Sequence, residues 1–451
     1  MGNHAKHAEK FVNNDSRTDW HDESLWYVRN KRDKAAHAID EWEELRELAS
    51  QIKTHTLTKL SDYLREFEAN ATKNGVVVHW AKDAKEHNEI VLKILQAKNI
   101  DRVVKSKSML TEECHLNQFL ESKNIEIVDT DLGEWIVQLK NQPPSHIVMP
   151  AIHLKKEEIG QLFKEKNITD IESDDPEFLT LASRVFLRKK FQLSKAAITG
   201  VNFAIAETGE VVVCTNEGNA DMGVHFSEVS IHCMGLEKII PKRKHLGVFT
   251  RLLARSATGQ NITVYTSHHR RPEKGQEKHV ILLDNGRSER IHDDDFWTAL
   301  KCIRCGACMN TCPIYRRSGG YSYDYTIPGP IGSILAPSVD LEAHGDLPFA
   351  STLCGSCTDV CPVKIDLHEQ LFRWRQIISK KQGANTLREL TNKATSLVLF
   401  NRNLYNLSTG LMKYVPSFIL NSKLNKWSKG RKTPKISNTS FKSWLKNKNK
   451  L

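Results

Sequence analysis

The stretch that decides the fold of this chain is CIRCGACMNTCPIYR, which runs from Cys302 to Arg316. Its four cysteines have the spacing C-x2-C-x2-C-x3-C-P, which is typical of bacterial ferredoxins. Three thiolates that lie two residues apart can bind three corners of one four-iron cubane, and the fourth cysteine points towards a second cluster. A second segment, CGSCTDVCPVKIDLHEQ at residues 354–370, adds three cysteines. Together the two segments predict two iron–sulfur clusters.

The second segment matches the first, except that Ser351 occupies its first cysteine position. In two-cluster ferredoxins the last cysteine of each segment binds the other cluster. The expected ligands of the first cluster are therefore Cys302, Cys305, Cys308 and Cys361, and those of the second are Cys312, Cys354 and Cys357. The second site is one ligand short of the four that a cubane needs.

Four arrangements would explain the incomplete second site. The fourth iron could be bound by Ser351, or by a nearby side chain such as Asp359 or His344. A partner subunit could supply the ligand instead. The site could also hold a three-iron cluster, or its fourth iron could be open to solvent or substrate.

Zinc is the main alternative to iron and sulfide. Zinc sites usually consist of paired C-x2-C units that make closed sets of four ligands. The segment 302–312 places more thiolates in one loop than a tetrahedral ion can use, which favours iron–sulfur clusters. The remaining cysteines, Cys114, Cys214 and Cys233, have no partner at ligand spacing, and we interpret them as small buried hydrophobic residues.

Length and composition indicate a cytoplasmic protein. The chain has 451 residues, of which 39% are hydrophobic, enough for two or three domains. No run approaches the roughly 18 apolar residues of a spanning helix, and the N-terminus lacks the apolar centre of a secretory signal. Ten cysteines in such a protein indicate metal binding rather than disulfides.

The pattern along the chain predicts four segments. Residues 1–70 read as amphipathic helices, and we interpret their interspersed Glu, Arg and Lys as a solvated face. Residues 71–286 alternate between strand and helix, which predicts an α/β domain with a mainly parallel sheet. Its expected strands include GVVVHW (75–80), DRVVKS (101–106), IEIVDT (125–130) and HIVMPA (146–151), and a hairpin is expected about Thr208-Gly209. Residues 287–383 form the cysteine domain, and 384–451 form a basic C-terminal region.

Several polar residues of the α/β domain lie where open sheets bind ligands, in turns and at strand ends. These candidates are Glu207, Asn216, Glu217 and Asn219. The alternative is that the asparagines only shape turns and that Glu207 is a paired structural acid. The basic cluster HHRR at residues 268–271 could bind a carboxylate, although a solvated loop is the simpler interpretation.

No cofactor other than iron–sulfur is indicated. A G-x-G-x-x-G turn after a strand, which would bind NAD, is absent from the sequence, and so is a flavin fingerprint. Tyr321, Tyr323 and Tyr325 could stack on a flavin, but we expect them to pack the linker against its own domain.

The C-terminal region carries the excess positive charge. The formal net charge is +11, and residues 390–451 contain Lys and Arg but no Asp or Glu. Basic residues alternate there with Trp427, Phe441 and Trp444. Such a tail could bind anionic lipid at the inner face of the membrane, near a quinone. A disordered solubilising tail fits equally well, and we expect no nucleic-acid partner.

Several independent motifs resemble the lactate-utilisation protein B family. They are KRDKAAHAIDEWEELRELASQIK, ITGVNFAIAETGEVVVCTNEGNADM, GLEKIIP, PGPIG and the two cysteine segments. The resemblance extends over roughly residues 10–420. It implies an α/β domain similar to the ribose-isomerase and CoA-transferase group, followed by an α-helical ferredoxin-like domain with two [4Fe-4S] clusters.

The resemblance also implies a function. The chain would be the iron–sulfur electron carrier in the oxidation of L-lactate to pyruvate, acting with two companion proteins, and so a component of an oxidoreductase. Lactate releases two electrons, whereas a cubane carries one at a time, so two adjacent clusters suit a relay to a quinone or similar acceptor. The seven-cysteine pattern is also that of the family. The alternative is an electron-transfer subunit of another dehydrogenase or of a heterodisulfide-reductase-like enzyme.

Overall fold

The structure is a computed structural model that describes residues 4–381, 386–412, 437 and 439–448. The chain divides into two units, residues 1–376 and residues 377–451. The first unit contains both the α/β domain and the cysteine segments.

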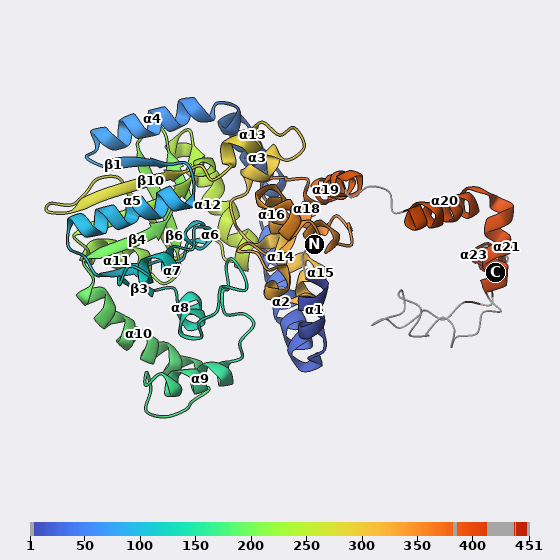
Figure 1. Cartoon of the computed structure of the whole chain (residues 1–451), viewed down its shortest axis with the longest axis horizontal. Helices are drawn as coiled ribbons and strands as arrows, with labels where there is room; N and C mark the ends of the chain where they lie inside the picture. Colours follow the sequence, from blue (N-terminus) through green and yellow to red (C-terminus); the bar gives the residue numbers. More distant parts are fainter. Residues whose placement is uncertain (1–3, 382–385, 413–436, 438, 449–451) are drawn as a thin grey trace. The chain divides into compact units, whose positions relative to one another are not determined.

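A six-stranded parallel sheet forms the centre of the first unit (Figure 1). Its strand order is β1 (Val77–Ala81), β10 (Glu277–Leu283), β7 (Val229–Gly235), β4 (Ala196–Gly200), β2 (Arg102–Lys105) and β3 (Glu126–Asp129). All neighbouring pairs are parallel. Every residue of β7 is buried, as expected for a parallel strand that is covered on both faces. The mainly parallel sheet predicted from the sequence is confirmed.

Helices cover both faces of this sheet. On one face, α5 (Ala84–Ala97), α6 (Met109–Glu113) and α7 (Leu116–Glu121) pack against β2 through residues such as Val103. On the other face, α8 (Leu132–Leu139), α9 (Lys156–Glu165), α10 (Pro176–Leu193) and α11 (Asn219–Phe226) pack against Val104. Successive residues of one strand thus enter opposite cores, because side chains alternate across a strand.

A smaller sheet continues the α/β domain. Its order is β8 (Ile239–Ile240), β5 (Phe203–Ile205), β6 (Glu210–Thr215) and β9 (Tyr265–His269). Strands β5 and β6 form the antiparallel hairpin that the sequence predicts. Gly209 turns it with a φ of 67°, and a Cβ there would lie 2.2 Å from the backbone nitrogen of Ala71. Glycine is therefore required at this turn.

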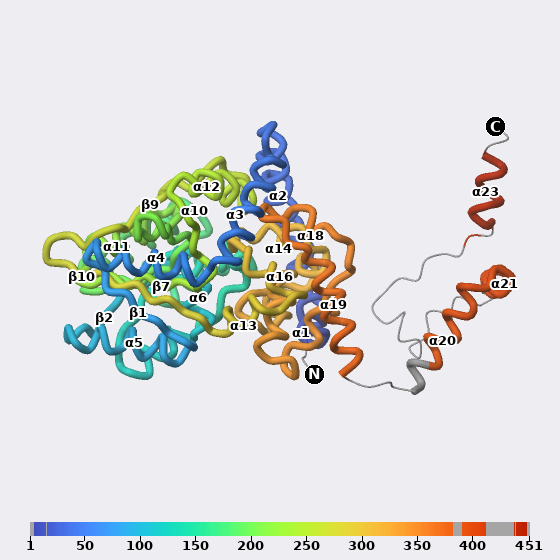
Figure 2. Tube along the Cα trace, turned by 90° about the horizontal axis from the view of Figure 1, so that it is seen from above, coloured from blue at the N-terminus to red at the C-terminus, as the bar shows by residue number. Residues whose placement is uncertain are grey.

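Four helices precede the sheet, in agreement with the helical prediction for residues 1–70. They are α1 (His4–Val12), α2 (Asp15–His37), α3 (Trp42–Thr58) and α4 (Leu60–Lys73). Helix α4 packs on the small sheet through Leu60, Leu64 and Phe67. Helices α2 and α3 contact α12 (Arg243–Thr258) and elements of the cysteine segment, as Figure 2 shows from above.

Two features of the α/β domain differ from the sequence prediction. The segment HIVMPA at residues 146–151 is an irregular loop and not a strand, since the neighbouring Pro143, Pro144 and Pro150 cannot donate ladder hydrogen bonds. The strand β10, which separates β1 from β7, was not predicted. It lies beyond a charged turn and shows no polar alternation, because it is buried on both faces.

All elements described between residues 287 and 381 are helical. They are α13 (Arg287–Ile291), η2 (Trp297–Lys301), α14 (Ala307–Thr311), α15 (Pro313–Ser318), η3 (Gly320–Tyr323), α16 (Gly329–Val339), α17 (Leu341–His344), η4 (Leu347–Phe349), α18 (Ser356–Asp359) and α19 (Leu367–Lys381). This agrees with the expected α-helical domain around the cysteines.

The second unit contains α20 (Thr386–Phe400), α21 (Arg402–Met412) and α23 (Phe441–Lys448). Phe441 and Trp444 are exposed on α23. Trp427 lies outside the described residues. In the part of the chain that the structure describes, no helix combines the length and the apolar character needed to cross a membrane.

Lys105 forms a buried ion cluster at the carboxyl end of β2. Its side chain has no exposed surface, and its Nζ lies 2.6 Å from Asp129, 3.0 Å from Glu112 and 3.5 Å from Glu134. Burial alone would lower the pKa of Lys105, but the three carboxylates raise it well above its usual value. Lys105 therefore neutralises acids that come from three different elements.

We expect Lys105→Met to destabilise the protein by about 3–5 kcal/mol, because it leaves buried carboxylates without a counter-charge. Urea unfolding, followed by circular dichroism, measures this loss. The control Lys98→Met removes an exposed ion pair with Glu277 and should cost less than about 1 kcal/mol. Equal losses for the two variants would contradict the role assigned to Lys105.

Candidate functional site

Four of the cysteines border one small cavity. Cys302, Cys305, Cys308 and Cys361 line it together with apolar side chains, among them Ile147 and Ile331. Burial and the nearby Cys302 raise the pKa of the Cys305 thiol to about 12. The four cysteines are those that the sequence assigns to the first cluster. The structure brings them together, and their ligation of iron remains a prediction.

The other three cysteines form a second group. Burial and the neighbouring Cys312 raise the pKa of the Cys357 thiol to about 12, and Cys354 adds to the effect. Cys312 and Cys357 are buried, whereas Cys354 is exposed. Three cysteines of the first group are buried and Cys302 is partly exposed, whereas the second group includes the exposed Cys354.

The two cysteine segments repeat the same backbone conformation. Arg304 and Gly306, which flank Cys305, have φ values of 61° and 78°. Leu353 and Gly355, which flank Cys354, have φ values of 54° and 80°. Non-glycine residues seldom adopt this left-handed conformation, so its occurrence at both positions indicates a specific loop shape.

Ser351 stands in the second loop where Cys302 stands in the first. The backbone N–H of Arg304 donates to Sγ of Cys302 at 3.4 Å. The backbone N–H of Leu353 donates to Oγ of Ser351 at 3.1 Å. The serine side chain therefore has the position and the amide partner of a ligand cysteine. The structure gives no comparable contact for Asp359 or His344, and the ring of His344 packs edge-on against Tyr325.

The cysteine groups fit iron–sulfur clusters. Among the described residues no His, Cys, Asp and Glu side chains converge closely enough to hold a single metal ion. Four thiols around a small apolar cavity match instead the corners of a cubane. Backbone amides reach the sulfurs, as in the 3.4 Å hydrogen bond from Ile365 N–H to Cys361 Sγ. Such amide donors stabilise thiolate ligands and tune a cluster's potential.

Basic side chains of the N-terminal helices hold the cysteine loops. The Arg46 guanidinium on α3 donates to the carbonyl oxygens of Cys361 at 2.9 and 3.1 Å and of Asp359 at 2.6 Å. Arg32 on α2 donates to the carbonyl oxygen of Val360 at 3.1 Å. The solvated face expected for these helices is therefore wrong at Arg32 and Arg46, which are buried against the cysteine segments.

A second basic group lies beside Cys302. Lys53 on α3 is buried and donates to the carbonyl oxygen of Glu237. Burial lowers its pKa to about 8, while the carboxylate of Glu237 opposes that shift. Lys301 donates to Oγ of Ser50 at 2.7 Å. Buried cations at this place would offset the negative charge of clustered thiolates.

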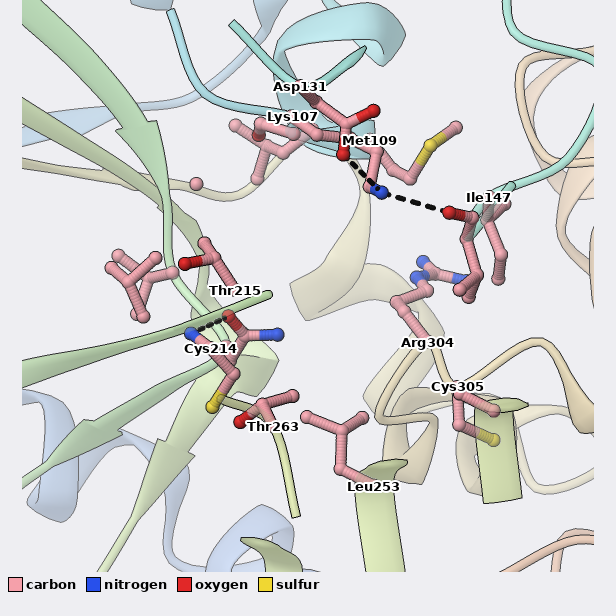
Figure 3. Close-up of a pocket in the computed structure, with 18 of the residues that line it drawn as sticks. Lys107, Met109, Asp131, Ile147, Cys214, Thr215, Leu253, Thr263, Arg304 and Cys305 are labelled. Carbon is pink, nitrogen blue, oxygen red and sulfur yellow. Dashed lines mark hydrogen bonds and ion pairs between the residues drawn. The ribbon is translucent and has the colours of Figure 1, made fainter. Parts of the chain in front are cut away.

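A larger pocket of about 500 Å³ opens beside the first cysteine group (Figure 3). One wall is the carboxyl edge of the parallel sheet, where residues that follow β2, β3, β4 and β7 meet. Open α/β sheets bind ligands at this edge. The other wall includes Arg304 and Cys305 of the cysteine loop, which face Cys214 and Thr215 across the pocket in Figure 3. The pocket therefore joins the α/β domain to the first cysteine group.

Three of the four predicted ligand residues line this pocket, namely Asn216, Glu217 and Asn219. Glu207 does not line it. That side chain is exposed and accepts a hydrogen bond from the backbone N–H of Arg243 at 3.0 Å, at the start of α12. Lys107, Lys238 and Arg304 also line the pocket but were missed. Arg304 lies inside the quoted cysteine motif and Lys238 inside the quoted motif GLEKIIP, so both were open to prediction from those motifs.

The irregular loop 146–151 positions the cysteine segment against the pocket. Buried His146 contacts Asn310 Oδ1 through Nε2 at 3.0 Å, and Asn310 donates to the carbonyl oxygen of Ala257 at 3.0 Å. Burial lowers the pKa of His146 to about 3, so the ring is neutral. Because Nδ1 accepts the backbone N–H of Val148, Nε2–H is the donor to Asn310. A Cβ on Gly306 would lie 3.1 Å from this ring, so a larger residue at position 306 would crowd His146.

The structure also places the remaining residues that the sequence singled out. The basic residues 268–271 line a separate cavity with His225 and Lys278, and His269 is buried. Tyr321 donates to the carbonyl oxygen of Pro143 at 2.8 Å, and Tyr323 is buried. The ring of Tyr325 packs against His344 within the cysteine domain, as expected. The expectation is wrong for Tyr321, whose partner lies in the α/β domain. Cys114 and Cys233 are buried, as expected, whereas Cys214 is partly exposed in the pocket.

Comparisons with known proteins match both parts of the first unit. A model of the LUD domain matches residues 64–292, and a model of the 4Fe-4S dicluster domain matches residues 298–365. The expected [4Fe-4S] type of the two clusters agrees with the second model. The more specific similarity to the ribose-isomerase group stays a prediction.

Curated relatives match nearly the whole chain. Lactate utilization protein B of Bacillus cytotoxicus is 42% identical over 92% of this chain and 90% of its own. The protein of the same name from Anoxybacillus flavithermus is 40% identical over 93% and 92%. A solved structure of a duf162 family protein from Deinococcus radiodurans covers 50% of this chain and 98% of its own, at 13% identity and a TM-score of 0.28.

The contacts of Arg46 predict that Arg46→Ala loosens the second cysteine segment. Three hydrogen bonds to the carbonyl oxygens of Asp359 and Cys361 are lost, and an ionic donor contributes about 1.5–3 kcal/mol per bond. We expect the purified variant to contain less iron per chain and to lose its visible absorbance faster during incubation with a chelator. The control Arg65→Ala changes an exposed arginine of α4 and should behave as the wild type. Equal iron loss in both variants would contradict the proposed role of the Arg46 hydrogen bonds in holding the second cysteine segment.

Proposed function

This chain belongs to the lactate utilization protein B family, and we propose that it relays the electrons of L-lactate oxidation to pyruvate through two iron–sulfur clusters. Membership of the family and the matched dicluster domain support a role in lactate utilisation with iron–sulfur electron transfer. One observation carries the more specific proposal. Cys305 borders both the pocket at the sheet edge and the cavity of the first cysteine group.

The arrangement of the cysteines supports a direction for the relay. The first group adjoins the pocket and has three buried cysteines, while the second group contains the exposed Cys354. Helices α14 and α18, which carry Cys308 and Cys357, contact each other. Electrons would thus enter beside the pocket and leave at the surface near Cys354. Clusters held there supply one-electron transfer, so the two electrons of lactate move in succession.

The protein residues then have defined tasks. The cysteines hold the clusters, and the basic groups Arg46, Arg32 and Lys53 compensate negative charge at the loops. The loop 146–151 and the apolar side chains around the first group exclude water from it. We propose that two companion proteins supply the remaining steps and that a quinone or a similar acceptor takes the electrons. A peripheral contact of the C-terminal region with the membrane would bring the relay near such an acceptor.

We further propose that Ser351 is the fourth protein ligand of the second cluster. Its Oγ accepts the amide hydrogen bond that Cys302 Sγ accepts in the first loop. The Arg375 guanidinium donates to the Ser351 carbonyl oxygen at 2.7 Å and holds this residue in place. Among the arrangements that the sequence left open, we prefer this one because the contacts of the second loop hold Ser351 in the position of a ligand.

We predict that Cys305→Ala abolishes lactate-dependent electron flow while the α/β domain stays folded. The variant removes a cysteine that borders both the pocket and the first cavity. The assay is reduction of an artificial acceptor by L-lactate in the presence of the companion proteins, with circular dichroism to check folding. Cys114→Ala, in the sheet core, should keep its iron and its activity. Normal flow and normal iron in Cys305→Ala would refute the relay.

The ligand role of Ser351 predicts different iron counts for two variants purified anaerobically. Ser351→Cys should keep about eight irons per chain, because a thiolate replaces the alkoxide at the same corner. Ser351→Ala should fall to about seven and show the EPR signal of an oxidised three-iron cluster. Eight irons in Ser351→Ala, with the wild-type EPR spectrum, would exclude Ser351 as a ligand.

A further inference from the structure

The pocket at the sheet edge contains two cations that lack an acidic partner. Of its four basic residues, Lys107 bonds Asp131 at 2.8 Å and Arg287 bonds Glu237 at 2.6 Å. Arg304 and Lys238 make no salt bridge within the described residues. The first pair of cations is thus neutralised by carboxylates, whereas Arg304 and Lys238, which are both partly exposed, have no such partner among the described residues.

Arg304 is the more constrained of the two cations. Its Nη1 is buried without a hydrogen-bond partner among the described residues. Its backbone has a φ of 61°, so the side chain is directed by a loop shape that the flanking cysteines fix. In Figure 3 the guanidinium extends from the cysteine loop towards the space enclosed by the lining residues. A buried N–H donor that lacks a partner is costly, and a bound anion would remove that cost.

Lys238 is the second cation and follows β7 in the chain. It lies next to Glu237, but that carboxylate is bound by Arg287. Burial lowers the pKa of Lys238. Glu237 and Cys302 oppose that shift, and the nearby charge of Arg304 adds to it. The mutual repulsion of Lys238 and Arg304 is a second reason why this end of the pocket favours a negatively charged ligand.

Neutral polar groups in the same pocket also lack partners. Asn219 is only 5% exposed, and its Oδ1 is buried without a hydrogen bond among the described residues. Oγ1 of Thr215 is likewise buried without a hydrogen-bond partner among the described residues. Ile147, Leu253 and similar side chains line the rest. The pocket thus combines a cationic end, a few unused hydrogen-bonding groups and apolar walls, which is typical of small-molecule sites.

We propose that this pocket binds a small carboxylic acid with a hydroxyl or keto oxygen next to the carboxylate, and that Arg304 and Lys238 hold the carboxylate. The choice of a 2-hydroxy or 2-oxo acid rests on the proposed function, whereas the anion site itself rests on the unpaired cations. Planar guanidinium and carboxylate groups pair in a bidentate manner, which also orients the acid.

This placement gives the cysteine loop two tasks. Arg304 fixes the acid, and the next residue, Cys305, belongs to the first cysteine group. The acid would therefore be held within one residue of a ligand of the first cluster. The cavity of about 500 Å³ exceeds the needs of a three-carbon acid, so acids with longer side chains should bind as well.

Calorimetric titration of the full-length, cluster-loaded protein under anaerobic conditions tests this site. The probes are L-lactate, pyruvate and lactamide, the last of which lacks the negative charge. We expect saturable binding of the two acids and none of lactamide. Arg304→Gln and Lys238→Gln should each weaken binding of the acids at least tenfold, and Arg304→Lys should retain part of it. The matched controls Arg317→Gln and Lys244→Gln change basic residues outside the pocket lining and should bind as the wild type.

Three results would overturn the site: no saturable binding of either acid, equal binding of lactamide, or wild-type affinity in both Arg304→Gln and Lys238→Gln. Iron is counted in every variant, and Lys238→Gln decides the question if Arg304→Gln loses its cluster. The test is separate from the relay. Cluster reduction by lactate and the companion proteins, without acid binding by this chain, would refute the site and leave the relay intact. Acid binding by this chain without any cluster reduction would support the site and refute the relay.

Discussion

The negative charge that the proposed clusters and their thiolate ligands would carry is the constraint on which the rest of this structure depends. Seven cysteines lie in two segments, and six of them are at least partly buried. An ionised group inside a protein needs compensation by hydrogen bonds or by opposite charge. Here amides of left-handed loops reach the sulfurs, and Arg32, Arg46 and Lys53 approach from the N-terminal helices. The first 70 residues are therefore part of the cluster site, although they lie far from the cysteines in sequence.

The parallel sheet determines where that site meets a ligand. Its strands end at one edge, and the residues that follow them form one wall of the pocket. The cysteine loop supplies the opposite wall, held there by His146 and Asn310. Because one loop contributes both Arg304 and Cys305, the proposed recognition of a ligand and the proposed transfer of its electrons would be properties of neighbouring residues. A change in the position of this loop would affect both.

The sequence predicted what depends on local pattern. The cysteine spacing indicated two groups, and the alternation of strands and helices indicated a parallel sheet, because spacing and periodicity are properties of short segments. Arg46 could not be predicted in the same way. A lysine or arginine on an amphipathic helix reads as solvated until the partner surface is known, and the carbonyl of Cys361 is 315 residues away. The unpaired state of Lys238 and Arg304 is likewise a tertiary property, since it depends on which acids the other cations occupy.

The two cysteine groups differ in a way that gives the molecule a polarity. The loops share a backbone conformation, but Cys302 is replaced by Ser351, and Cys354 is exposed whereas its counterpart Cys305 is buried. A buried cluster next to a ligand pocket is protected from solvent, and its potential is set by nearby charges. A cluster near the surface can pass electrons to another protein. The oxygen ligand proposed for the second site would then lie at the exit of the relay, where access for a partner matters more than enclosure.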